Sequence, residues 1–151
     1  MKKVLLYTDG ACSFNPGPGG WGAVLIYGTV EKRISGFQNN TTNNRMEIMA
    51  VIMGLKALKE PCSVDIYTDS AYVYNAFKER WIENWIKNNW KNSNKKEILN
   101  QDLWLVLKDL VDIHDAQFHK VLGHSTNKYN NLCDSLARNE VKKYLDSINV
   151  D

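Results

Sequence analysis

The amino-acid sequence predicts an α/β fold, in which a mixed sheet of about five strands is flanked by helices. Strand and helix patterns follow one another in the order β-β-β-α-β-α-α-α-β-α. The first three strands are close enough in sequence to form an antiparallel meander, and later strands are separated by helices that can serve as crossovers. The chain shows no internal repeat and no linker, so one domain over residues 1–151 is expected.

The N-terminal part is expected to form the meander. Residues 3–8 are predicted to be an apolar strand, followed by a loop rich in turn residues, DGACSFNPGPGG. Residues 21–27 form the second strand, and Gly28-Thr29 makes a hairpin turn. Residues 30–37 alternate polar and apolar side chains, as a third strand does.

The remainder alternates helices and strands. A helix is predicted from about Arg45 to Lys59, because apolar residues recur there at helical spacing between several N-cap candidates and Pro61. Residues 63–68 are predicted to be a buried strand. The other expected elements are a helix from Asp69-Ser70 to at least Phe77, helices over 81–90 and 103–113, a strand over 117–122, a loop over 123–131 and a helix over about 132–145.

Composition indicates an ordinary globular protein, with 44% hydrophobic and 24% charged residues. No segment approaches the roughly 20 apolar residues that cross a bilayer. The apolar run before Asp9 is too short for a signal peptide. Cys12, Cys62 and Cys133 are odd in number and lack CxxC spacing, which favours reduced thiols. We therefore expect a cytoplasmic protein with no membrane contact, and a monomer, since nothing indicates an oligomer.

Positive charge is concentrated in one segment. The formal net charge is only +2, yet residues 78–96 hold six basic and two acidic side chains. Trp81 and Trp85 are four residues apart, so they share a helix face. Lysines among aromatic residues, such as Lys87 and Lys91, suit contact with nucleic-acid phosphates and sugars. Alternatively, the tryptophans anchor this helix to the core.

Four carboxylates occupy positions that structural rules do not favour. Asp9 ends an apolar strand in YTDG, and Asp69 ends another in YTDS. Side chains beyond the carboxyl ends of strands line the functional crevice of open α/β sheets, so these two are expected to lie close together. Glu47 begins a helical stripe of small apolar residues and should therefore point toward the sheet. Asp134 is predicted in the first turn of the last helix.

Each carboxylate alone has a structural explanation. Asp9 could form a turn, Asp69 could cap a helix, Asp134 could interact with its helix dipole, and Glu47 could belong to a capping box. Together, however, the four repel one another, and no Arg or Lys is placed to neutralise them. Arg45 is expected to project from another face of its helix than Glu47. Divalent cations resolve the repulsion, and all-oxygen ligands select Mg²⁺ or Mn²⁺ over zinc.

Four blocks of the chain resemble the signature blocks of type 1 (bacterial-type) ribonuclease H. They are YTDGACSFNPGPGGWG, TTNNRMEIMAVIMGL, IYTDSAYV and KVLGHSTNKYNNLCDSLA, in order and at compatible spacing. The resemblance implies the ribonuclease H-like fold. It also implies a Mg²⁺-dependent endonuclease that hydrolyses the RNA strand of RNA–DNA hybrids by a two-metal-ion mechanism and leaves 5′-phosphomonoesters.

The resemblance also implies roles for individual residues. Asp9, Glu47, Asp69 and Asp134 match the family's metal-binding carboxylates, with Asp9 bridging two Mg²⁺ ions, for which Mn²⁺ can substitute. Glu47 and Asp69 would complete one metal site, and Asp134 would contribute to the other. His124 matches the family's loop histidine, which assists proton transfer or product departure.

Substrate contacts follow from the same motifs. Short polar groups near the metals can read the 2′-hydroxyls of RNA. The positions that match RNA-strand contacts are Cys12, Asn15, Asn43 and Asn44, although the last two could also cap a helix. Residues 78–96 resemble the family's basic protrusion, which cradles the DNA strand. Ile86, Asn88 and Asn89 make this protrusion less basic than the family pattern.

Two other functions fit part of the sequence. A non-catalytic hybrid-binding module could use the same scaffold, but such a module tolerates the loss of a carboxylate, and all four are present. A different two-metal phosphotransfer enzyme, such as an exonuclease or an integrase relative, would also use the carboxylates. The basic segment and the Asn43-Asn44 pair favour the hybrid-cleaving function over this one.

Overall fold

The computed structural model describes residues 1–122 and 127–148 and contains, within them, a five-stranded sheet of order β3-β2-β1-β4-β5. Strands β1 to β3 form an antiparallel meander, whereas β4 and β5 run parallel to β1. The mixed sheet predicted from the sequence is therefore confirmed. The strands are β1 (Lys2–Cys12), β2 (Gly17–Tyr27), β3 (Val30–Thr41), β4 (Cys62–Thr68) and β5 (Asp115–Lys120).

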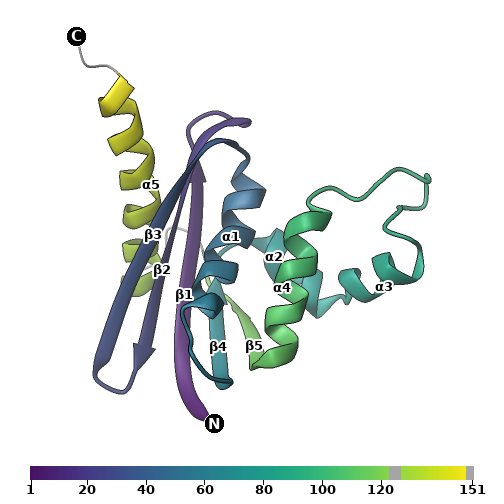
Figure 1. Ribbon diagram of the computed structural model, residues 1–151, viewed down its shortest axis with the longest axis horizontal. Coiled ribbons are helices and arrows are strands. Elements are labelled where there is room, and N and C mark those ends of the chain that lie inside the picture. The colour runs from purple at the N-terminus through teal and green to yellow at the C-terminus, as the bar shows by residue number, and fades with distance from the viewer. Residues whose placement is uncertain (123–126, 149–151) are drawn as a thin grey trace.

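Helices cover both faces of the sheet (Figure 1). Helix α1 packs on one face of β1 and β2, and α5 packs on the opposite face across β1 to β3. Helix α4 lies beside α1, and α3 projects from the body on the side away from α5. Among the described residues, none of these helices has the length and hydropathy of a membrane-spanning segment. The helices are α1 (Asn43–Lys56), α2 (Ala71–Lys78), α3 (Trp81–Lys87), α4 (Gln101–Ile113) and α5 (Lys128–Ile148).

The main core lies between the sheet and the layer formed by α1, α2 and α4. Leu6 of β1, Leu55 of α1 and Trp104 of α4 are all fully buried in it. Gly54 allows α1 to approach closely, because a Cβ there would lie 2.6 Å from a methyl carbon of Leu6. The small-residue stripe on this helix faces the sheet, as the sequence predicted.

The predicted turn-rich loop after the first strand is mostly strand instead. Strand β1 continues past Asp9 to Cys12, and β2 already begins at Gly17. The glycines that suggested a loop are there because helices pack directly on this hairpin. A Cβ at Gly19 would lie 2.9 Å from a side-chain atom of Met46 in α1, and one at Gly20 would lie 2.2 Å from a backbone oxygen in α5.

Several helix ends also differ from the predictions. Helix α5 begins at Lys128, about four residues early, because the side chain of Asn127 accepts hydrogen bonds from the backbone N–H groups of Tyr129 and Asn130. Asp134 therefore lies in the second turn of α5, not the first. Helix α3 ends at Lys87, before two residues with positive φ angles, and α1 ends at Lys56.

The docking of α5 depends on a strand glycine. We predict that Gly22→Ala lowers the free energy of unfolding by about 1–3 kcal/mol, because the new methyl would lie 2.5 Å from the backbone oxygen of Cys133. Urea unfolding measures the change. Gly28→Asn is the control: Gly28 has a φ of 59° with nothing within 4 Å of the added carbon, and Asn tolerates this conformation. Equal losses in both variants would contradict the prediction.

Candidate active site

The candidate site lies where β4 stops and β1 continues. The two YTD motifs pair in register, Tyr7 with Tyr67 and Thr8 with Thr68, and the second of these pairs is the last between the strands. Asp9 is the first residue of β1 beyond β4, and Asp69 directly follows β4. Their predicted proximity is confirmed, although Asp9 lies within its strand and does not end it.

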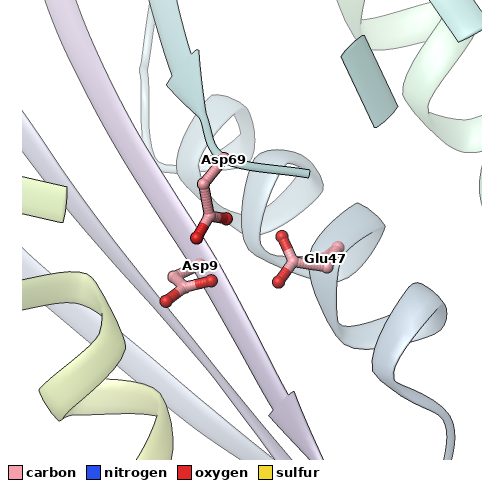
Figure 2. Close-up of side chains that lie close together, drawn as sticks. All are labelled: Asp9, Glu47 and Asp69. Atoms are coloured by element: carbon pink, nitrogen blue, oxygen red, sulfur yellow. The ribbon is translucent and has the colours of Figure 1, made fainter. Parts of the chain in front are cut away.

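Glu47 reaches the same place from α1, which crosses β1 at Gly10. A Cβ at Gly10 would lie 2.6 Å from the backbone nitrogen of Glu47, so the contact requires glycine. Beyond the end of β4, the Gly10 N–H donates to Asp9 Oδ1 at 2.9 Å and to Glu47 Oε1 at 3.0 Å. Figure 2 shows the carboxylates of Asp9, Glu47 and Asp69 pointing toward one another.

The three carboxylates are close enough to share one cation. One oxygen from each of Asp9, Glu47 and Asp69 lies within 4.8 Å of the others. Asp9 is 5% exposed and Glu47 is 4% exposed. Glu47 Oε2 is buried and has no hydrogen-bond partner among the described residues. A buried carboxylate oxygen without a partner is unfavourable, so this donor set fits a divalent cation.

Burial and mutual repulsion also change the acidity of the site. Burial raises the pKa of Asp9 to about 7, and repulsion from Asp69 and Asp134 adds to this, against the opposing hydrogen bonds from Glu47 and Gly10. Burial, followed by the neighbouring Asp9, raises the pKa of Glu47 well above its usual range. Both shifts favour the protonated carboxyl in the cation-free pair, so protons and a cation would compete for this site.

Asp134 lies near this group but is less closely joined to it. It lines the same cleft, of about 410 Å³, but is not one of the three carboxylates within 4.8 Å. Arg138 Nη1 lies 3.4 Å from Asp134 Oδ2, so the expectation that no basic residue neighbours the carboxylates is wrong at this position. The spacing of four residues on one helix could have signalled the pair.

The structure also tests the alternative that Glu47 and Asp69 serve only as helix-capping residues. Arg45 projects away from Glu47, as predicted, and pairs with Asp102 at 2.8 Å. Thr42, whose hydroxyl accepts from Arg45 N–H, is the N-cap of α1, so Glu47 forms no capping box. Ser70 caps α2 by accepting from Val73 N–H, so Asp69 is not needed as a cap.

The predicted RNA-strand residues gather at the rim of the cleft. Asn43 and Asn44 are exposed, line the cleft and do not cap α1. Asn15 joins them, because its Oδ1 accepts from the backbone N–H of Asn43 at 3.1 Å. Cys12 is half-buried in the adjoining wall of β1. His124 lies outside the described residues.

The predicted protrusion is fastened to the core by its tryptophans. The ring centroid of Trp85 lies 5.9 Å from that of Trp81 and 5.8 Å from that of Trp104, so the anchoring role is confirmed. Both α3 tryptophans are only half-buried. Lys87 is exposed, and Lys91 lines a groove of about 640 Å³ together with Trp85. Anchoring therefore leaves the basic surface accessible.

Comparison of the amino-acid sequence with known proteins finds relatives described as ribonuclease H. A family model described as RNase H matches residues 1–142. A protein of Acetivibrio thermocellus named Ribonuclease H is 61% identical over 143 residues, which cover 95% of this chain and 97% of that protein.

Solved structures with a similar fold include a ribonuclease H and a viral reverse transcriptase. LC9-RNase H1, described as a type 1 RNase H with the type 2 active-site motif, has a TM-score of 0.85 at 28% identity, covering 94% of this chain and 73% of that one. A foamy viral protease-reverse transcriptase, solved in complex with an RNA/DNA hybrid, has a TM-score of 0.79 at 25% identity, covering 94% of this chain and 20% of that one.

The crowded carboxylates should make the cation-free protein less stable as pH rises. The folded-state pKa of Asp9, about 7, exceeds the ordinary value of 3.8, so the folded state binds more protons between these values. Stability is therefore lost as pH rises through this window. We predict that Asp9→Asn increases the free energy of unfolding at pH 8 in EDTA, on the order of 2 kcal/mol.

Thermal unfolding from pH 5 to 8, with EDTA or Mg²⁺, measures this effect. Wild type should gain stability from Mg²⁺ at pH 8, and the variant should gain far less. Asp109→Asn removes an exposed carboxylate of α4 and is the control. A variant no more stable than wild type at pH 8 in EDTA would rule out this account of the site.

Proposed function

The chain belongs to the ribonuclease H family, and from this we propose that it is an endonuclease that hydrolyses the RNA strand of RNA–DNA hybrids. The observation that carries the proposal is the convergence of Asp9, Glu47 and Asp69, with Asp134 in the same cleft. A relative in fold, the foamy viral enzyme, was solved in complex with such a hybrid.

We propose that the four carboxylates hold two Mg²⁺ ions. Glu47 and Asp69 would share one ion with Asp9, and Asp134 would share the second. Two features support this: the unpartnered Glu47 Oε2, and the position of Asp9, whose pKa is raised by both Asp69 and Asp134. When bound, such a pair of ions activates a water and stabilises the leaving 3′ oxygen of the scissile phosphate. The all-oxygen donor set suits Mg²⁺, and Mn²⁺ can replace it.

The chain's own residues orient the reacting groups. The Gly10 N–H holds one oxygen of Asp9 and one of Glu47, which fixes both carboxylates before substrate arrives. Asn43 and Asn44 would contact RNA 2′-hydroxyls, and Cys12 and Asn15 would extend this contact; their position at or beside the rim of the cleft supports these roles. For His124, the role in proton transfer or product departure rests on the sequence motif.

We propose that residues 78–96 form a basic protrusion within a single domain and bind the DNA strand. Helix α3 and the segment after it extend from the body in Figure 1, and the exposed lysines lie along them. Lys87 and Lys91 would contact phosphates, while the half-buried Trp81 and Trp85 would pack against sugars. A monomeric state and a cytoplasmic location remain predictions from the sequence.

A non-catalytic hybrid-binding module is the alternative. Such a module requires no cation. The cluster of three mutually repelling carboxylates, one with a buried and unpartnered oxygen, would then have no function that offsets its energetic cost. Incubating a hybrid labelled on either strand, with Mg²⁺ or with chelator, separates the two functions. Cleavage of the RNA strand that needs Mg²⁺ supports the enzyme, whereas a gel shift without cleavage supports the binding module.

Asp9→Asn is expected to abolish cleavage and to leave hybrid binding largely intact. Loss of a ligand shared by both ions should raise the barrier by several kcal/mol, which corresponds to less than about 1% of wild-type turnover. Single-turnover cleavage and fluorescence anisotropy with the same labelled hybrid measure the two effects. Residual turnover above this level would argue against a bridging ligand.

The protrusion lysines are expected to act on binding. Changing Lys87, Lys91, Lys95 and Lys96 to Ala should raise KM more than it lowers kcat, because these side chains would contact the substrate away from the reacting phosphate. Steady-state kinetics at moderate salt measures both constants. The control changes four exposed lysines elsewhere, Lys3, Lys32, Lys56 and Lys59, and so removes the same charge. An equal rise in KM in the control would refute the assignment.

A further inference from the structure

A second cavity adjoins the catalytic cleft. It measures about 530 Å³ and lies between the β1–β2 hairpin and α5. The hairpin contributes Cys12 and Ser13 to one wall. Gly10, Asn43 and Asp134 line both this cavity and the catalytic cleft, so the two lie side by side. We call this cavity the α5 groove.

The α5 wall of this groove carries two cationic side chains. Arg138 and Lys142 are four residues apart, so they share one helix face about 5–6 Å apart at Cβ. Asp146, one turn further on, ends this basic stretch. The groove lies beside the proposed phosphate-cleaving site. Its two adjacent positive charges complement the negative charge of a nucleic-acid backbone.

Arg138 contacts the Asp134 carboxylate, and it could exchange this partner for another anion. Its contact with Asp134 is long, at 3.4 Å, and the two side chains are 73% and 43% exposed. Exposed ion pairs of this kind contribute little to stability. An incoming phosphate can therefore replace Asp134 as the partner of Arg138 without a large penalty.

We propose that the α5 groove binds backbone phosphates of the RNA strand beside the cleavage site, and that Arg138 passes from Asp134 to one of these phosphates when the hybrid binds. The inference rests on the proposed function, since it assumes a hybrid in the cleft. The groove belongs to the RNA strand because it contains Cys12 and Asn43, the proposed RNA contacts. The protrusion proposed to bind DNA lies on the opposite side of the molecule from α5 (Figure 1).

The exchange has a consequence for the cation site. While Arg138 pairs with Asp134, its positive charge opposes a cation at that carboxylate. Hybrid binding removes this opposition, so the hybrid and the cation at Asp134 should bind cooperatively. By linkage, each increases the affinity of the other by the same factor.

The first test measures hybrid binding in EDTA, where no cleavage occurs. Changing both Arg138 and Lys142 to Ala should weaken binding about tenfold and reduce the slope of log K against log salt by about 1–2. The matched control changes Lys143, which pairs with Glu140 on the same helix, and the exposed Lys56 to Ala, and so also removes two positive charges and one ion pair outside the groove. An unchanged slope in the double variant, or an equal change in the control, would overturn the proposal.

The second test identifies the strand. Single uncharged methylphosphonate linkages are placed in turn along the RNA strand and along the DNA strand. One or two RNA positions near the cut should weaken wild-type binding but leave Arg138→Ala binding unchanged, because the contact is already lost. The same non-additivity on the DNA strand, or on neither strand, would overturn the proposal.

The third test measures Mg²⁺ binding by calorimetry without nucleic acid. Arg138→Ala should bind Mg²⁺ about two- to fivefold more tightly than wild type, and Lys143→Ala should not. Weaker or unchanged binding in Arg138→Ala would overturn the exchange. Failure of the proposed function looks different: wild type would then leave the RNA strand uncut in Mg²⁺, whereas failure of the groove leaves wild-type cleavage intact.

Discussion

Repulsion among buried carboxylates is the constraint around which this end of the molecule is built. Asp9 and Glu47 are almost fully removed from water and lie beside Asp69, an arrangement that burial and charge both oppose. Among the described residues, the Gly10 N–H donates to both carboxylates, and a hydrogen bond between Asp9 and Glu47 gives further compensation. The fold holds these groups in place through its packing elsewhere, and binding of protons or cations would relieve their repulsion.

The sheet supplies the geometry through a difference in strand length. Strand β1 runs on for several residues after its last pair with β4, which leaves one side of β1 open. Into that opening come Asp69 from the end of β4 and Glu47 from α1, and the missing side chain at Gly10 sets how closely α1 can approach. The site is thus formed from three segments that meet at one point, and no single segment carries it.

The sequence predicts the parts of the site that depend on repeating patterns. The twin YTD motifs predicted that Asp9 and Asp69 lie close together near the ends of two strands, and the small-residue stripe after Glu47 predicted that its side chain points toward the sheet. Sequence patterns give a wrong prediction where one residue type, such as glycine, occurs both in loops and at close helix–strand contacts. The glycines after Asp9 resemble a loop, although they serve helix packing, and the start of α5 depends on one side chain, Asn127, that no apolar period reveals. The Arg138–Asp134 pair was missed although both residues lie within the predicted last helix, because only basic residues next to each carboxylate in sequence were considered and not those four residues away.

The position of α5 in the sequence affects when the site can form. Its backbone rests against Gly20 and Gly22 of β2, and it follows all five strands along the chain. During synthesis on the ribosome, Asp9, Glu47 and Asp69 are therefore made before Asp134, which reaches the site only when α5 docks on the sheet. A nascent chain at this stage would hold an incomplete set of the proposed ligands, so cleavage of a hybrid would have to wait until α5 had packed.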